Sequence, residues 1–380
     1  MPSKNTIRMS AAGAGKTWGI CHDALAVVAS PLFTKRVLIT TFTNKGVETI
    51  QSEIRKQNQG VLNPRIVIYS WYQFLLYELI RPYQTSIAEI NEIKSFDFSD
   101  MFNKINYHAK GQKSRYITSR GNVRANEASE LVLQLNAISN GRVIKRMEKV
   151  YSNVFVDEIQ DMAGSDLDII SLLLESSIIT VCVGDNKQAT YRTHNTQRHK
   201  NQPGKNIWEY FSCACKSGKA EIENNLVSRR FNEQICHFAN RLYSNENNIT
   251  TVMRERTGHD GVFLILHDDV PYYYAVFSPV VMKYDKRTET DCFDSFNFGQ
   301  CKGVTFERVL IYPNGPLSDY INTGKQLKSQ QKYYVAVTRP KYSIAIVVDA
   351  FPTSDQFTYE NIRCGDREIR AMRYICEEEK

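Results

Sequence analysis

The sequence contains no apolar run of the roughly 20 residues that a membrane-spanning helix needs. It also contains no internal repeat and no low-complexity tract. No signal peptide is expected, because a glycine-rich loop begins at Ser10, directly after the first expected strand. These absences predict a cytoplasmic protein without a membrane partner.

Paired Cys-x-x-Cys spacing is missing as well, although the chain has nine cysteines. The closest approach is Cys213-Ala-Cys215, and the total is odd. Scattered cysteines without a metal or disulfide spacing are typical of reduced thiols in a cytosolic protein.

Composition is that of an ordinary soluble globular protein, with 42% hydrophobic and 23% charged residues. The length of 380 residues allows two or three domains. Lysine and arginine total 48 against 41 acidic residues, which gives a net charge of +7. This modest surplus suits a partner with a phosphate backbone.

Strand and helix patterns alternate along the first part of the chain, which predicts an α/β fold with parallel sheets covered by helices. The expected strands are 7–9, 36–41, 65–69, 154–156 and 178–183, and the expected helices are 17–28, 44–57 and 71–79. Asn44 is the expected N-cap of the second helix. A second alternating unit is expected from helix 230–242, strands 261–266 and 308–312, helix 328–338 and strand 343–348.

The pattern loosens between these units, which predicts the domain organisation. Residues 81–148 are expected to form an inserted helical subdomain, and its segment 104–124 is basic. The full prediction is a first lobe at 1–80 and 149–205, a second lobe at 206–350 with a small insert at 243–292, and a C-terminal tail or helix at 351–380.

A phosphate-binding loop is predicted near the N-terminus. A strand followed by a glycine-rich turn and a helix start points backbone N–H groups at one spot, which forms an anion cradle. Lys16 is expected to reach the β- and γ-phosphates, and Thr17 to ligate magnesium. The residues expected to bind the nucleotide here are Ser10, Ala11, Ala12, Gly13, Ala14, Gly15, Lys16 and Thr17.

The run Asp157-Glu158-Ile159-Gln160-Asp161 follows the apolar strand Val154–Val156. Ionised groups at the end of a buried strand cost several kcal/mol unless a partner compensates, and a magnesium-bound nucleotide would be that partner. Asp157 is therefore the expected magnesium-side carboxylate. Glu158 is the expected base that orients the attacking water.

Two further sets of residues have two interpretations each. Asp185, Gln188 and Tyr191 follow a strand, so they either sense the γ-phosphate and present a ring to a base, or form an Asp-Asn turn with a core tyrosine. Arg230 and Arg339 either stabilise charge on a transferring phosphoryl group or are surface and helix-end arginines.

Taken in order, these segments resemble the superfamily 1 helicases of the UvrD/Rep type. The Asp-Glu-x-Gln-Asp form of 157–161 and the Gly184–Gln188 segment with Tyr191 match motifs of that family. Three further segments resemble its motifs: Ser228-Arg229-Arg230, Cys301-Lys302-Gly303-Val304-Thr305-Phe306, and Val335 to Arg339. The resemblance covers nearly the whole chain, from Ser10 to about Val348.

The resemblance implies two RecA-like P-loop lobes that bind ATP and Mg²⁺ in the cleft between them. It implies movement along single-stranded or partly duplex DNA with 3′-to-5′ polarity, with Arg230 and Arg339 as arginine fingers and Gly303 at the nucleotide. The implied DNA contacts are Phe42, Thr43, Asn44, Lys45, Trp71, Tyr191 and Lys302.

Three departures from the family are informative. Little chain precedes Ser10, so no glutamine motif is expected to read adenine. Trp18 and Arg229 stand where relatives have an arginine and a tyrosine around the base, which suggests an inverted clamp. The second-lobe insertion is short, Thr193 replaces an expected aromatic residue, and Gly299 replaces a histidine.

The segment Gly299 to Phe306 also resembles short helicases found beside phage-defence nucleases, of the Gabija type. The alternative function is therefore a DNA-sensing ATPase subunit that regulates a partner nuclease or effector without processive unwinding. A P-loop kinase would need an acceptor site and no paired arginine fingers. An intrinsic nuclease is not expected, because no carboxylate cluster stands outside the expected ATP site.

Overall fold

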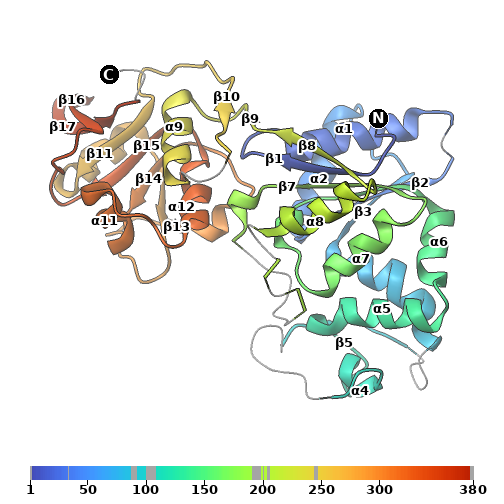
Figure 1. Ribbon diagram of the computed structural model, residues 1–380. Helices are drawn as coiled ribbons and strands as arrows, with labels where there is room; N and C mark the ends of the chain where they lie inside the picture. The colour runs from blue at the N-terminus through green and yellow to red at the C-terminus, as the bar shows by residue number, and fades with distance from the viewer. Residues whose placement is uncertain are drawn as a thin grey trace. The chain divides into compact units, whose positions relative to one another are not determined.

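The structure is a computed structural model that describes residues 2–32, 34–86, 92–99, 108–190, 198–199, 201–202, 206–243 and 247–376. The chain divides into two compact units. Unit 1 comprises residues 1–10 and 16–224, and unit 2 comprises residues 11–15 and 225–380. Figure 1 shows each unit as a sheet with helices packed against it.

Unit 1 is built on a six-stranded sheet in the order β3-β2-β6-β7-β1-β8. The pairs from β3 through β1 are all parallel. Its central strands β2, β6 and β7 are buried along nearly their whole length, as expected where helices cover both faces. The strands are β1 (Thr6–Ser10), β2 (Arg36–Thr41), β3 (Ile66–Ser70), β6 (Tyr151–Val156), β7 (Ile179–Gly184) and β8 (Glu221–Asn225).

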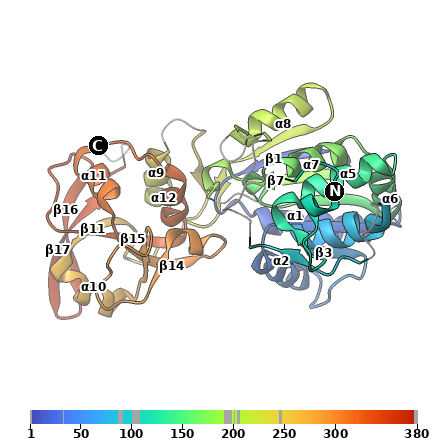
Figure 2. The ribbon, with the colours of Figure 1, turned by 90° about the horizontal axis from the view of Figure 1, so that it is seen from below.

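Two separate cores cover the faces of this sheet. The first packs α1 (Lys16–Ala29) and α2 (Asn44–Gln57) against side chains of β2, β3, β6 and β7. The second packs further helices of the unit against the opposite face (Figure 2). Its helices include α3 (Trp71–Phe74), the π-helix η1 (Leu75–Ile80), α5 (Ala128–Ile138), α6 (Arg142–Val150), α7 (Ser165–Leu174) and α8 (Ile207–Lys216).

The predicted helical subdomain at 81–148 does carry helices, but it has no core of its own among the residues that the structure describes. Its side chains, such as Leu131 and Val143, belong to the same buried cluster as Trp71 and Val154 of the sheet side. The small elements of this region are α4 (Lys113–Tyr116) and the short strands β4 (Phe96–Asp97) and β5 (Val123–Arg124).

Unit 2 is built on a seven-stranded sheet in the order β13-β12-β14-β15-β11-β17-β16. Pairing is parallel from β13 to β11 and antiparallel for β17 and β16. The strands are β11 (Gly261–Leu266), β12 (Val280–Lys283), β13 (Ser295–Asn297), β14 (Phe306–Tyr312), β15 (Pro340–Val348), β16 (Phe357–Cys364) and β17 (Arg367–Tyr374). A separate short pair joins β9 (Val227–Ser228) and β10 (Thr250–Thr251).

Helices cover both faces of the second sheet. One face packs against α9 (Glu233–Leu242), α11 (Gly315–Thr323) and α12 (Gln330–Val337). The other packs against α10 (Val270–Phe277). The α/β fold with parallel sheets is therefore confirmed.

Three predictions about the second half of the chain are wrong. The segment predicted as a tail or helix at 351–380 contains a β-hairpin within its described residues 351–376, because β16 and β17 pair, and the turn between them contains Gly365 with a positive φ of 66°. The predicted insert at 243–292 contains β11 and β12, which are strands of the main sheet. Residues 206–224, assigned from sequence to the second lobe, belong to unit 1, because α8 packs in its core and β8 adjoins β1.

One helix start was also mispredicted. Thr43, and not Asn44, is the N-cap of α2, because its hydroxyl accepts a hydrogen bond from the Gly46 N–H at 3.0 Å. Across the described parts of the chain, no helix is both long and apolar enough to cross a membrane.

Candidate nucleotide site

The carboxyl ends of three neighbouring strands bring the predicted catalytic segments of unit 1 together. β7 lies between β1 and β6, and the three strands run parallel. Their ends therefore meet at one edge of the sheet, where open α/β sheets bind ligands. Lys16 follows the end of β1, Asp157 follows β6, and Asp185 follows β7.

The loop after β1 has the backbone of an anion cradle. Gly13 and Gly15 have positive φ values of 76° and 80°, a region that glycine enters without a Cβ penalty. The Ala14 N–H donates to the Ala11 carbonyl at 3.1 Å, which closes a tight turn. Lys16 opens α1, and its Nζ lies 3.4 Å from the carbonyl oxygen of the buried Ser10.

Within unit 2, the same loop packs against the Ser228–Arg230 segment. The Arg229 N–H donates to the Gly13 carbonyl at 2.9 Å, and the Ala11 N–H donates to the Asn225 carbonyl at 2.9 Å. A Cβ on Gly13 would lie 2.5 Å from Ser228 Oγ and 2.6 Å from Arg230 Cβ. Only glycine fits at this position, for reasons of both space and backbone conformation.

Asp157 and Glu158 occupy the end of β6 in different environments. The Asp157 N–H donates to the Thr40 carbonyl of β2 at 2.8 Å, and one Asp157 carboxylate oxygen accepts from the Glu158 N–H at 3.0 Å. Glu158 is in the left-handed region, with φ 57° and ψ 40°. Such a backbone costs a non-glycine residue free energy and is concentrated at functional sites. Asp157 is buried and Glu158 half-buried.

A buried amide connects Glu158 to the segment after β7. Gln160 is fully buried; its Nε2 donates to Glu158 Oε2, and its Oε1 accepts from the Asp185 N–H at 2.9 Å. Asp185 in turn accepts from Gln188 Nε2 at 2.6 Å. Lys16 Nζ lies 3.9 Å from the same Asp185 oxygen, Oδ2. This relay of contacts therefore reaches Lys16, Glu158 and Gln188.

Gly184 makes the close approach of these two strand ends feasible. A Cβ at this position would lie 2.5 Å from Gln160 Oε1 and 2.7 Å from Ile159 Cγ2. Distances this short force a shift of the Gln160 amide. Gly184, the last residue of β7, therefore leaves the space that the Gln160 side chain occupies.

The donor set at this edge fits magnesium bound to a nucleotide. Magnesium prefers oxygen ligands and is usually held by one or two carboxylates together with substrate phosphates and water. Asp157 offers a buried carboxylate, and Thr17 offers a hydroxyl at the start of α1. Among the described residues, no group of three or more His, Cys, Asp or Glu side chains could hold a metal alone.

The two predicted arginine fingers lie next to each other in unit 2. Arg230 Nη1 donates to the Thr338 carbonyl at 3.0 Å, directly before Arg339. Arg339 is buried, and its guanidinium donates to the Val335 carbonyl at 2.9 Å and to Thr338 Oγ1 at 3.2 Å. The guanidinium of Arg339 is therefore hydrogen-bonded to the C-terminal end of α12.

Trp18 and Arg229, the residues of the suggested base clamp, are both exposed. Trp18 is 53% exposed, and its ring stacks on His22 with centroids 4.9 Å apart and an interplanar angle of 8°. Arg229 Nη1 lies 3.5 Å from the Ala14 carbonyl in unit 2. One face of the indole is therefore covered by His22.

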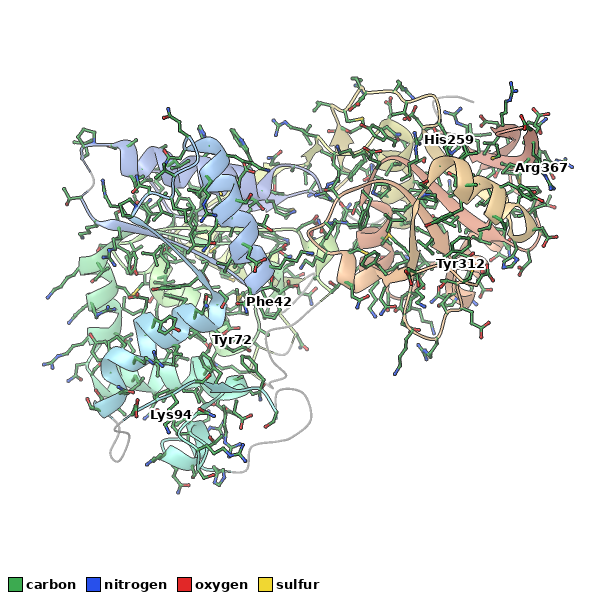
Figure 3. The ribbon with its side chains drawn as sticks, turned by 180° about the vertical axis from the view of Figure 1, so that it is seen from behind. Phe42, Tyr72, Lys94, His259, Tyr312 and Arg367 are labelled. Carbon is green, nitrogen blue, oxygen red and sulfur yellow. The ribbon has the colours of Figure 1, made fainter. Side chains whose placement is uncertain are left out.

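The residues predicted to contact DNA have different environments. Phe42 is half-buried and directly follows β2 (Figure 3). Thr43, Asn44 and Lys45 are exposed at the start of α2. This segment lies at the same sheet edge as Asp157, because β2 pairs in parallel with β6.

Trp71 does not fit its predicted role. Its side chain is fully buried, and its indole Nε1 donates to Asp166 Oδ1 at 2.8 Å. Asp166 also accepts from Ser129 Oγ. Because the ring is anchored inside the core, it cannot stack on a base, and the prediction is wrong.

Lys302 and Gly303 lie just before β14 of unit 2. Lys302 is half-buried, and Gly303 is exposed with a positive φ of 82°. A Cβ added to Gly303 would meet no heavy atom within 4 Å, so the backbone here is open to solvent. Tyr191 lies outside the described residues.

The contacts of four residues were not predicted from the sequence. Gln160 was recognised only as part of a motif, while its two hydrogen bonds depend on a neighbouring strand. Ser228 was recognised only as part of the segment Ser228-Arg229-Arg230, and Asp166 has no local signal. The partners of both residues are distant in the chain. His22 could have been found, since it lies four residues after Trp18 on one helix face.

A known protein family matches part of the chain. Residues 70–201 match the UvrD/REP helicase N-terminal domain. This range contains Asp157 to Asp161 and Gly184 to Gln188, so the match supports a UvrD-type helicase domain in this segment. No curated protein matches the sequence.

Solved structures also match the chain. One is described as the complex structure of Arterivirus nonstructural protein 10 (helicase) with DNA, at 12% sequence identity and a TM-score of 0.46. The match covers 93% of this chain, and this chain spans 61% of the length of that one.

Proposed function

We propose that this protein is an ATP-dependent DNA translocase or helicase of the UvrD/Rep type, with 3′-to-5′ polarity. The observation that carries the proposal is the relay from Lys16 through Asp185 and Gln160 to Glu158. It joins the phosphate-loop lysine, a candidate base and the γ-phosphate sensor Gln188 in one connected group. The helicase domain matched at 70–201 contains all of these residues except Lys16.

In this proposal each residue of the relay has a defined task. The loop N–H groups and Lys16 bind the ATP phosphates, and Thr17 and Asp157 hold Mg²⁺, which would offset negative charge on the β- and γ-phosphates. Glu158 accepts a proton from the attacking water. Arg230 and Arg339 are proposed to stabilise charge on the γ-phosphate as arginine fingers.

Backbone pairing gives a route by which DNA could influence hydrolysis. The segment Phe42–Lys45 is proposed to bind single-stranded DNA through stacking and phosphate contacts. It begins two residues after Thr40, whose carbonyl accepts the Asp157 N–H at 2.8 Å. A shift of β2 on DNA binding would therefore move the end of β6.

A strand-displacement assay tests the proposal. The substrate is a DNA duplex with a 3′ single-stranded overhang, with a 5′ overhang as the polarity control. We expect DNA-stimulated ATP hydrolysis and displacement from the 3′ overhang, both lost in Lys16→Ala. Hydrolysis that DNA does not stimulate would contradict the proposal.

A second function is favoured by one observation. Residues 247–292 contain two strands of the main sheet of unit 2 and the helix α10, which leaves little chain for a regulatory insertion there. The alternative is a DNA-sensing ATPase that regulates a partner nuclease in antiviral defence. DNA-stimulated hydrolysis without displacement of either substrate would favour this function.

Trp18→Ala tests the proposed base clamp. The indole is exposed and backed by His22, so it offers one free face for stacking on the adenine of ATP. Loss of an aromatic stack of about 1–2 kcal/mol is expected to weaken ATP binding by about 5–30-fold. Trp18→Phe should keep most of the affinity. The measurement is the Kd of a fluorescent ATP analogue, and an unchanged value in Trp18→Ala would rule the clamp out.

A further inference from the structure

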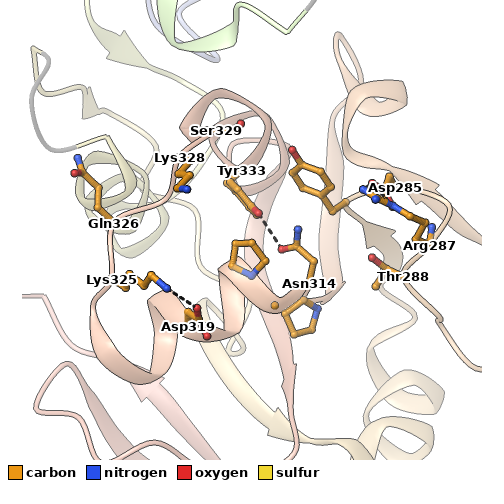
Figure 4. A pocket seen from close by; sticks show the side chains of 14 residues that line it. Asp285, Arg287, Thr288, Asn314, Asp319, Lys325, Gln326, Lys328, Ser329 and Tyr333 are labelled. Carbon is orange, nitrogen blue, oxygen red and sulfur yellow. Dashed lines mark hydrogen bonds and ion pairs between the residues drawn. The ribbon is translucent and has the colours of Figure 1, made fainter.

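Unit 2 contains a cavity of about 680 Å³ at the carboxyl edge of its sheet (Figure 4). This volume is within the range of small-molecule sites. Figure 4 shows Lys325 and Lys328 on one side, Asp285 and Arg287 on the other, and Asn314 and Tyr333 between them. The cavity involves none of the residues assigned above to ATP or DNA.

Strand order places this cavity where α/β sheets bind ligands. After β12 the chain continues to β13 on one side, and after β14 it continues through α11 and α12 to β15 on the other side. β12 and β14 are parallel neighbours. A crevice beyond two such strands, whose connections leave in opposite directions, is the usual ligand site of an open parallel sheet. Residues 284–288 and 313–316 follow these two strands and supply much of the lining.

Charge at the cavity favours an anion. Its lining has three cations, Arg287, Lys325 and Lys328, against two carboxylates, Asp285 and Asp319. Lys325 pairs with Asp319 at 3.1 Å, and Arg287 pairs with Asp285 at 2.6 Å. Lys328 has no carboxylate partner among the residues that the structure describes.

The pair of Arg287 and Asp285 can open to a ligand. Hydrogen bonds from Arg287, together with its charge, lower the pKa of Asp285 to about 2, so both groups are charged at neutral pH. The Arg287 side chain is 82% exposed, and solvent screening keeps such a pair weak. Arginine binds phosphate oxygens through the same donors that it offers to a carboxylate.

Two helices also begin at the cavity. Asn314 caps α11 and Ser329 precedes α12, and both residues line the cavity. The Ser329 side chain makes no capping hydrogen bond. Helix N-termini carry partial positive charge, so they increase the positive electrostatic potential that the lysines create in the cavity.

One wall of the cavity is aromatic. Tyr284 and Tyr333 have ring centroids 5.3 Å apart, and the Tyr333 hydroxyl donates to Asn314 Oδ1 at 2.9 Å. Tyr284 is only half-buried. Lys332 Nζ lies over the Tyr284 ring, 4.6 Å from its centroid. An aromatic surface beside cations suits a ligand that joins an aromatic base to a phosphate.

From these observations we infer that the unit 2 cavity is a second nucleotide-binding site, which takes a phosphate between Lys325, Lys328 and Arg287 with the base against Tyr284. The ligand that we infer is a free mononucleotide, because the volume of the cavity is that of a small-molecule site. Binding of a DNA strand is an outcome of the experiment below. The inference is independent of the proposed ATPase site, because it uses no residue of that site.

The test measures binding of AMP and of a twelve-nucleotide oligothymidylate to the full-length chain by calorimetry. All proteins carry Lys16→Ala to weaken the proposed ATP site. Lys325→Glu with Lys328→Glu reverses two exposed charges, and Arg363→Glu, an exposed cation on β16, is the matched control. Loss of charge-assisted hydrogen bonds is expected to weaken binding by about 10-fold or more, against less than about 2-fold in the control.

Each outcome decides the inference. Weakened AMP binding supports the inference. Weakening confined to the oligonucleotide would overturn it, because the cavity would then bind a strand and not a free nucleotide. Unchanged affinity for both ligands would overturn the inference. Photolabelling with 8-azido-AMP provides a second measurement on the protein without cavity substitutions. We expect labelled peptides that contain Tyr284 or Tyr333, and label found only outside residues 284–333 would contradict the site.

Discussion

Glu158→Gln is expected to lower kcat for ATP hydrolysis by about 10²–10⁴-fold, the usual contribution of a general base. Glutamine keeps the size of the side chain but cannot accept a proton from water. The phosphate loop and Asp157 are unchanged, so ATP should still bind with a Kd within about 3-fold of the wild-type value, a difference of about 0.7 kcal/mol. The measurements are steady-state hydrolysis with and without single-stranded DNA and equilibrium binding of ATP.

The control for this substitution is Glu175→Gln. Glu175 is an exposed carboxylate of unit 1 that pairs with Lys219, and it lies between α7 and the start of β7, away from the carboxyl ends of the strands. Loss of the Glu175 charge should leave kcat for ATP hydrolysis unchanged. If Glu158→Gln retained more than about a tenth of the wild-type kcat, a contribution below about 1.4 kcal/mol, Glu158 would not be the base.

The strands and helices could be predicted where hydrophobic pattern alone determines them. Strands 36–41 and 261–266 and helix 44–57 have the bounds expected from sequence. Each is an apolar run or an amphipathic pattern with clear polar flanks. The hairpin of β16 and β17 was missed, because the buried positions of β16 and β17 do not alternate regularly with exposed ones.

The candidate site was predictable as a set of residue types but not as a set of contacts. Lys16, Asp157, Glu158, Asp185 and Gln188 all follow strands, and parallel strand ends meet at one edge. Which side chains touch depends on strand order, and only the fold places β7 between β1 and β6. The sequence therefore could not show that Gln160 bridges Glu158 and Asp185.

Trp71 illustrates the opposite error. An aromatic residue after a strand end matched the pattern of a DNA contact, yet the ring is buried against Asp166. Its neighbour Ser70 starts α3 with a capping box to Gln73, which turns the following side chain into the core. The Trp71 ring is buried because α5 and α7 pack around it, and these helices are distant from Trp71 in the sequence.

Gln160 is expected to be a positioning residue, and Gln160→Glu should expose that role through pH. The amide orientation is fixed by its partners, because Nε2 faces the Glu158 carboxylate and Oε1 faces the Asp185 N–H. In the variant a second carboxylate faces Glu158. Two carboxylates in contact cannot both ionise readily, so the pair holds a shared proton to higher pH than an isolated carboxyl.

The variant should therefore lose hydrolysis mainly at acidic pH and regain it as the pH rises towards neutral. If the pKa of the pair rises by about two units in the variant, the loss approaches 100-fold only at a pH below the ordinary glutamate range and is small at neutral pH. The acidic limb of the kcat/KM profile should shift upward. Gln160→Leu removes both hydrogen bonds without adding charge, so its kcat should fall without that shift.

A purely structural role for Gln160 makes a different prediction. Both variants would then lower Tm and leave the shape of the pH profile unchanged. Gln134→Glu, which adds the same charge on α5, controls for net charge. An unshifted profile in Gln160→Glu, at a hydrolysis rate close to that of Gln134→Glu, would show that the relay does not position Glu158. A shifted profile would identify Gln160 as the link through which the segment after β7 controls the base.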